Sequence, residues 1–158
     1  GGGVGIPPLY HLADTFLGNA YKVGRERVRV LLGARSKRFL LCEKEFQKIK
    51  VDVSVATDDG SKGRKGFVTD LLEDFLDTVD PREVFIYACG PTPMMKATSE
   101  VAARHGVRCY LSLESPMACG FGVCSGCVVR MRETPEAPPR YRRICLDGPV
   151  FDAAQVCW

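Results

Sequence analysis

Apolar positions along the first two thirds of the chain fall into short runs and helical stripes that follow one another in turn. Four short apolar or alternating runs are typical of strands and cover residues 27–34, 51–57, 83–88 and 107–113. Four segments with apolar residues at helical spacing precede or separate them: 7–24, 37–49, 68–79 and 92–106. Because parallel neighbours need crossover connections, this alternation predicts an α/β fold, with a Rossmann-like parallel sheet and helices on both faces.

The boundaries of the last of these helices are marked by residue type. Thr92 is suited to be its N-cap, Pro93 its first residue and Gly106 its C-cap. The chain opens on a glycine loop, Gly1 to Gly5, of the kind that normally follows a strand and precedes a helix. No strand precedes it here, so we expect this sequence to be a fragment in which the first strand of the sheet is missing.

From residue 115 onward the pattern changes. Glycine and cysteine dominate first, and a proline-rich loop over 135–139 follows, flanked by β-prone runs over 127–132 and 141–146. We therefore expect two domains: a dinucleotide-binding domain over residues 1–114 and a small β-rich module over residues 115–158.

Composition narrows the classes of function. The chain has 158 residues, of which 46% are apolar and 26% charged, an ordinary globular balance. No window approaches the roughly 18 apolar residues of a membrane span, and no basic-then-apolar leader opens the chain. The net charge of +3 comes from interspersed side chains, which gives no footprint for nucleic acid but suits a small anionic ligand. These features favour a soluble, cytoplasmic protein with neither a membrane nor a nucleic-acid partner.

Cysteine spacing gives the most specific signal for chemistry. The chain holds eight cysteines, and four of them follow the pattern Cys119-x4-Cys124-x2-Cys127, with Cys145 after a longer gap. This is the ligand spacing of plant-type 2Fe–2S proteins, and the intervening glycines would let backbone N–H groups point at the sulfurs. The alternative is a structural zinc site, although zinc sites usually present two short cysteine pairs.

Two further motifs fit a nucleotide. The N-terminal glycine loop could cradle a pyrophosphate with its N–H groups, although such loops are often plain turns. Cys89, Gly90 and Pro91 end a predicted strand and open a helix, the place where open α/β sheets bind ligands. The plainer interpretation of this tripeptide is a structural turn with a buried thiol.

Together these segments resemble a known family. In order along the chain they read GGGVGIPPL, GAR, ATDDGS, ACGPTPMM, LESPMACGFGVCSGC and CLDGPVFDA. Over essentially all residues, this resembles the electron-transfer subunits of type B dihydroorotate dehydrogenases, within the ferredoxin-NADP reductase superfamily. The resemblance implies an N-terminal FAD-binding barrel, which has no counterpart in this sequence, then a nicotinamide dinucleotide domain and a C-terminal 2Fe–2S module.

The resemblance also implies roles for individual residues. The residues expected near the pyrophosphate are Gly2, Gly3 and Gly5, and those expected near the nicotinamide and flavin rings are Cys89, Gly90 and Pro91. The cluster ligands would be Cys119, Cys124, Cys127 and Cys145.

Charge at the end of the second predicted strand bears on the choice of dinucleotide. NADP-preferring members of the superfamily place a serine and an arginine there, whereas this chain has Thr57 and Asp58. A carboxylate can accept the ribose hydroxyls and repels an added phosphate, so NAD is favoured, although Lys62, Arg64 and Lys65 lie close by in the sequence.

The function implied is electron transfer between NAD and the FMN of a dihydroorotate-oxidising partner subunit, through FAD and the 2Fe–2S cluster. The partner would carry the dihydroorotate chemistry, the two kinds of subunit would form a heterotetramer, and this chain alone should not turn over. A hydride carries two electrons and the cluster accepts one, so a flavin must stand between them. The alternatives are the reductase subunit of a hydrogenase or of an NAD(P)H:ferredoxin oxidoreductase and, in a different class, a non-catalytic zinc-stabilised binding module.

Overall fold

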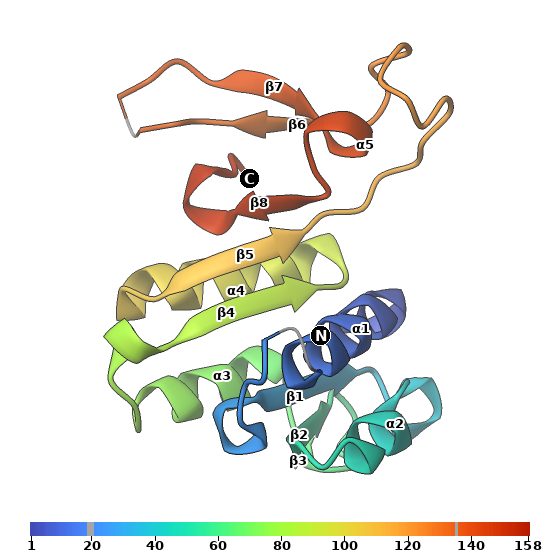
Figure 1. Ribbon diagram of the computed structural model, residues 1–158, viewed down its shortest axis with the longest axis vertical. Coiled ribbons are helices and arrows are strands. Elements are labelled where there is room, and N and C mark those ends of the chain that lie inside the picture. Colours follow the sequence, from blue (N-terminus) through green and yellow to red (C-terminus); the bar gives the residue numbers. More distant parts are fainter. Residues whose placement is uncertain (19–20, 135) are drawn as a thin grey trace.

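A computed structural model describes residues 1–18, 21–134 and 136–158 (Figure 1). Its helices are α1 (Ile6–Leu17), α2 (Glu43–Lys48), α3 (Val68–Leu76), α4 (Thr92–His105) and α5 (Ile144–Asp147). Its strands are β1 (Arg29–Ala34), β2 (Asp52–Thr57), β3 (Arg64–Lys65), β4 (Phe85–Cys89), β5 (Arg108–Ser112), β6 (Val128–Met131), β7 (Arg140–Arg143) and β8 (Val150–Asp152). The predicted α/β fold with parallel strands is confirmed.

The parallel strands form two groups instead of one continuous sheet. β1, β2 and β3 form one sheet in the order β1-β2-β3, and β4, β5 and β8 form another in the order β4-β5-β8, where β8 is antiparallel to β5. The N-terminal glycines lie between the two groups: Gly33 N–H donates to Gly1 O at 2.9 Å, and Gly2 N–H donates to Cys89 O at 3.1 Å. Gly1 and Gly2 thus link the carboxyl ends of β1 and β4, and Gly2 forms an isolated parallel bridge with Gly33.

Helices cover both faces of this arrangement, as the alternation predicts. In β1, Leu32 is buried in a core with Phe46 of α2 and Ile6 of α1. The neighbouring Leu31 packs instead against the core that contains Leu72 of α3. Successive side chains of a strand point to opposite faces, so α1 and α2 lie on one face while α3 and α4 lie on the other.

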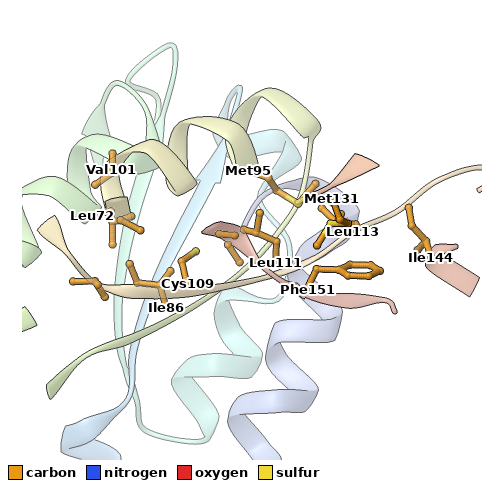
Figure 2. Packing of buried hydrophobic residues seen from close by; sticks show 14 of the residues in the cluster. Leu72, Ile86, Met95, Val101, Cys109, Leu111, Leu113, Met131, Ile144 and Phe151 are labelled. Atoms are coloured by element: carbon orange, nitrogen blue, oxygen red, sulfur yellow. The ribbon is translucent and has the colours of Figure 1, made fainter. Parts of the chain in front are cut away.

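The C-terminal segment shares the core of the β4–β5 sheet. Phe151 of β8 lies opposite Leu111 of β5 in the strand register and belongs to the same buried cluster as Met131 and Ile144. Figure 2 shows these side chains gathered in one interior together with Met95 of α4. The β6–β7 hairpin and α5 lie at the opposite end of the molecule from α2 and β3 (Figure 1).

Several element boundaries differ from the sequence prediction. The helix expected over 7–24 ends at Leu17, and its predicted course through residues 19–20 lies outside the described residues, as does residue 135 of the proline-rich loop. The helix expected over 37–49 is a 3-10 turn (Lys37–Phe39) followed by α2, because Cys42 adopts a left-handed conformation that interrupts it.

Further differences affect the second half of the chain. Pro91, not Thr92, is the N-cap of α4, whereas the C-cap at Gly106 is confirmed with φ +66°. The strand expected over 141–146 ends at residue 143, and the following residues form α5. The short strands β3 and β8 are additions to the predicted elements, because they carry too few residues to show a period.

Candidate dinucleotide and iron–sulfur sites

The glycine loop is held against the end of β4 by close backbone packing. A Cβ built on Gly5 would lie 2.4 Å from the carbonyl carbon of Cys89, so only glycine fits there. Gly5 N–H donates to Gly2 O at 3.1 Å, and α1 begins at the next residue. No side chain caps α1, but Pro7 and Pro8 carry no N–H and the N–H of Ile6 donates to Gly3 O, so the first turn of this helix offers few N–H groups to an anion.

A cavity of about 600 Å³ lies beside this loop, across the carboxyl ends of the strands. Its lining residues are Gly2, Gly3, Gly33, Ala34, Arg35, Phe39, Asp58, Phe67, Val68, Thr69, Pro91, Pro93, Met94 and Ala97. Four of the residues expected at the dinucleotide site, Gly2, Gly3, Asp58 and Pro91, are therefore brought together. Its position matches the edge at which open α/β sheets bind ligands.

The other expected nucleotide residues lie behind this lining. Thr57 is fully buried, and its hydroxyl donates to the carbonyl of Lys62 at 2.8 Å and accepts the N–H of the same residue at 3.0 Å. Thr57 therefore holds the loop that follows Asp58. Gly90 lies beside the glycine loop, since a Cβ built on it would be 2.9 Å from Gly2 O.

Cys89 ends β4 as a fully buried thiol. Its Sγ donates to Glu114 Oε1 at 3.7 Å, across the carboxyl ends of β4 and β5. Burial raises the pKa of the Cys89 thiol, and the Glu114 carboxylate raises it further. This thiol is therefore held in its protonated form at neutral pH.

Two of the three basic side chains between β2 and α3 are paired away from the cavity. Lys62 forms an ion pair with Glu43 of α2, and Arg64 forms one with Asp74 of α3. Neither Lys62 nor Arg64 belongs to the cavity lining. Asp59 accepts the N–H of Ser61 at 2.9 Å, and this hydrogen bonding lowers the pKa of the Asp59 carboxyl.

The four cysteines of the predicted cluster lie on two stretches of chain that backbone hydrogen bonds hold together. The N–H of Cys145 donates to the sulfur of Cys127 at 3.4 Å, and the N–H of Ile144 donates to the carbonyl of Cys127 at 2.9 Å. Within the loop, Gly126 N–H donates to the sulfur of Cys124 at 3.4 Å. Two sulfurs thus accept backbone N–H groups, as cluster ligands do.

These hydrogen bonds favour thiolates. Backbone N–H groups of Cys124 and Phe121 lower the pKa of Cys119 to about 6. The backbone N–H of Cys145 lowers the pKa of Cys127, whereas the hydrogen bond to Cys127 raises the pKa of Cys145. The thiolate is the form that ligates a metal, so the donor chemistry fits a cluster held by cysteines.

Cys119 interacts with Cys124, and Cys127 interacts with Cys145; Cys119 also contributes to the raised pKa of Cys145. Over the described ranges, no group of three or more His, Cys, Asp or Glu side chains lies in a ligating arrangement. The loop backbone between Cys119 and Cys124 is tightly turned: Gly122 has φ +86°, and its carbonyl accepts an N–H of the Arg143 guanidinium at 3.0 Å.

Sequence reasoning missed several residues at these sites. It assigned no function to Arg35, Phe39 or Phe67, yet all three line the cavity. The segment GAR, which ends at Arg35, entered only as part of a resemblance. The position of Glu114 just before the cysteine loop suggests either that it helps to seat a flavin or the loop, or ordinary packing; in the structure it is the acceptor for the Cys89 thiol.

Comparison with known proteins identifies the two parts of the chain. Residues 1–100 match the oxidoreductase NAD-binding domain family. The chain belongs to this family. Beyond this NAD-binding domain, residues 114–157 match the iron-sulfur cluster binding domain of dihydroorotate dehydrogenase B.

Curated relatives are similar over almost the whole NAD-binding chain. The protein of Caldanaerobacter subterraneus subsp. tengcongensis named dihydroorotate dehydrogenase B (NAD(+)), electron transfer subunit, is 42% identical over 99% of this chain and 57% of its own length. The protein of the same name from Geobacillus sp. (strain WCH70) is 40% identical over 99% of this chain and 55% of its own length. The resemblance to this group of subunits is confirmed, and the chain spans little more than half the length of these relatives.

A solved structure is also similar to the chain over nearly its whole length. A chain from the structure of an NADH-dependent reduced ferredoxin-NADP oxidoreductase matches 99% of this chain and 52% of its own length, at 36% identity and a TM-score of 0.76. Among the residues described for the NAD-binding chain, no helix is long and apolar enough to cross a membrane.

Proposed function

We propose that this chain is the dinucleotide- and cluster-binding part of an electron-transfer subunit of dihydroorotate dehydrogenase B. In this proposal, electrons from the FMN of a dihydroorotate-oxidising partner subunit reach NAD⁺ through a 2Fe–2S cluster and FAD, a step in pyrimidine biosynthesis. One observation carries this proposal: the same chain contains two sites. The first is a set of cysteine sulfurs that accept backbone N–H groups, and the second is a cavity at the carboxyl edge of parallel strands.

Each part of the chain has its own task in this proposal. Residues 1–114 bind NAD, with Gly2, Gly3 and Gly5 shaping the pyrophosphate site. Residues 115–158 hold the cluster through Cys119, Cys124, Cys127 and Cys145. A 2Fe–2S cluster supplies one-electron transfer when it is bound, and the backbone N–H groups that reach these sulfurs would adjust its potential.

In this proposal, the turn after β4 lies at the nicotinamide end of the dinucleotide. Cys89, Gly90 and Pro91 stand where the nicotinamide and flavin rings would meet, and the buried Cys89 thiol is kept protonated there. The FAD itself would bind mainly through a barrel that precedes this part of the subunit.

NAD is the dinucleotide that the charges favour over NADP. Asp58 lines the cavity, whereas Lys62 and Arg64 are paired with Glu43 and Asp74. A phosphate added to the ribose would meet this carboxylate. Lys62 and Arg64 are less able to offset the repulsion, which leaves Arg35 as the cation in the described lining that could do so.

The decisive experiment is dihydroorotate-dependent NAD⁺ reduction by the native complex, prepared anaerobically with the full-length subunit. Activity that disappears in Cys124→Ser, while the partner still reduces an artificial acceptor with dihydroorotate, would support the relay. Absence of activity despite bound FAD and an intact cluster would refute the proposed relay. Identification of the copurifying subunit would then show which substrate the complex uses.

The second candidate is a reductase subunit of an NAD(P)H:ferredoxin oxidoreductase. The likeness to a chain of a ferredoxin-NADP oxidoreductase, at 36% identity, favours it over a hydrogenase subunit or a zinc-stabilised binding module. In that case the native complex would reduce ferredoxin with a nicotinamide nucleotide and dihydroorotate would be inert. Analysis for iron and acid-labile sulfide against zinc tests whether the chain is instead a non-catalytic zinc module.

A further inference from the structure

Arg143, the last residue of β7, reaches from the hairpin into the cysteine loop. Its guanidinium Nη1 donates to the carbonyl of Gly122 at 3.0 Å, and Gly122 lies between Cys119 and Cys124. Two residues after Arg143, the chain supplies Cys145. Arg143 therefore bridges the stretch that carries three of the proposed ligands and the stretch that carries the fourth.

The backbone at Gly122 allows this close approach. Gly122 has φ +86°, and a Cβ built on it would lie 3.0 Å from Cδ2 of Leu146 and 3.5 Å from Nη1 of Arg143. The N–H of Gly122 acts on Cys145: hydrogen bonding to Cys127 raises the pKa of the Cys145 thiol, and the Gly122 N–H opposes this shift. Gly122 thus accepts Arg143 on its carbonyl and presents its N–H to a cysteine sulfur.

The environment of Arg143 differs from that of the other arginines in β7. Its side chain is 38% exposed, against 72% for Arg140 and 50% for Arg142, which both lie 3.9 Å from the Glu133 carboxylate. The Asp147 carboxylate of α5 accepts the backbone N–H of Arg143 at 2.7 Å and lies 3.7 Å from its Nε. The guanidinium therefore has its Nε side beside Asp147 and its Nη1 on the cysteine loop, where water screens its charge less than that of Arg140.

We propose that Arg143 is a positioning residue that holds its positive charge against the cysteine loop and thereby raises the reduction potential of the cluster. One-electron reduction adds one negative charge to a 2Fe–2S cluster, and a fixed cation nearby stabilises the reduced form more than the oxidised form. The Asp147 carboxylate has the opposite effect, because it repels the added charge. This inference rests on the proposed function and adds to it a residue that sets how readily the cluster accepts an electron.

The test is an anaerobic redox titration of the native complex with the full-length subunit, followed by the EPR signal of the reduced cluster. Arg143→Gln removes the charge and keeps a side-chain N–H that can donate to Gly122 O. It is expected to disfavour the reduced form about tenfold, which is a potential about 59 mV more negative for one electron. Arg143→Lys keeps the charge and should recover most of this loss. Asp147→Asn keeps an acceptor for the Arg143 N–H and should make the potential more positive.

The matched control is Arg140→Gln, which removes the same charge from the other end of β7 and should leave the potential unchanged. Iron and acid-labile sulfide are measured in every variant, so that potentials are compared at equal cluster content.

Two results would overturn the inference and leave the proposed relay standing: a wild-type potential in Arg143→Gln, or an equal shift in Arg140→Gln. If Arg143→Gln retains no cluster, Asp147→Asn decides, because an unchanged potential there would overturn the inference and a more positive one would support it. A wild-type subunit that contains no 2Fe–2S cluster would overturn the proposed function as well.

Discussion

Cys124 is the exposed member of the four cysteines in the cluster segment, and Gly126 N–H donates to its sulfur. Cys124→Ser is expected to lower the iron and sulfide content and to remove most of the visible absorption, because a hydroxyl is a poorer ligand than a thiolate. Cys157→Ser is the matched control, since Cys157 lies outside the ligand spacing and should leave both unchanged. Full iron content in the Cys124 variant would exclude this cysteine as a ligand.

At the level of single residues, the sequence was informative where chemistry restricts the residue type. Cysteine spacing singled out Cys124 and its partners, and the glycine loop singled out Gly5. It was uninformative about Phe39 and Phe67, because an exposed phenylalanine has the same local pattern whether or not it lines a cavity. Which side chains share a cavity is decided by tertiary contacts between segments far apart in the chain.

At the scale of elements, the junction of the glycine loop with β4 leaves no room for a side chain at Gly5. Gly5→Ala would place a methyl group 2.4 Å from the backbone of Cys89 and Gly90, so the loop and the strand must separate. We expect a loss of roughly 1–3 kcal/mol in unfolding free energy, the usual cost of overpacking, together with weaker ADP-ribose binding. In Gly18→Ala the nearest heavy atoms lie at 3.4 Å, so this control should lose far less stability in thermal denaturation.

The strand β8 joins the cluster segment to the sheet through one large side chain. Phe151 is 8% exposed and packs in the core beside Leu111 and Met131. Phe151→Ala is expected to cost about 3–5 kcal/mol of unfolding free energy through the lost burial and the cavity left behind. Val150 on the same strand is 54% exposed, so Val150→Ala should change the melting temperature little. Equal melting temperatures would show that β8 contributes no core packing.

Long elements with a clear period could be predicted from the sequence, and short ones could not. The helix over 92–106 and the strand over 51–57 were found within a residue or two. The segment 37–49 resembles one helix because apolar residues at both ends imitate helical spacing. These apolar residues belong to two separate helical turns, and Cys42 lies between the turns in a left-handed conformation. The pairing of β8 with β5 depends on contacts that no local pattern encodes.

For the molecule as a whole, we expect the partner subunit of the proposed complex to dock on exposed apolar side chains beside the cysteines. Phe121 is 67% exposed and Val123 is 74% exposed, and both lie between Cys119 and Cys124. In the full-length complex, Phe121→Ala is expected to lower dihydroorotate-dependent NAD⁺ reduction several-fold, because aromatic anchors contribute heavily to interfaces. NADH-dependent reduction of ferricyanide should be unchanged. Tyr21→Ala, which removes a 64% exposed ring outside the cluster segment, is the control for both assays.

The pairing of β5 with β8 also explains how the cysteine segment is attached to the parallel sheet. Leu113 N–H donates to Pro149 O at 2.9 Å, so the residues between them leave the sheet and return to the same point. Topologically, β5 and β8 are the two strands of an antiparallel hairpin, and the segment with the four cysteines forms its long connecting loop. Because both ends of this insert meet at one point, it interrupts neither the pairing of β4 with β5 nor the order of the parallel strands.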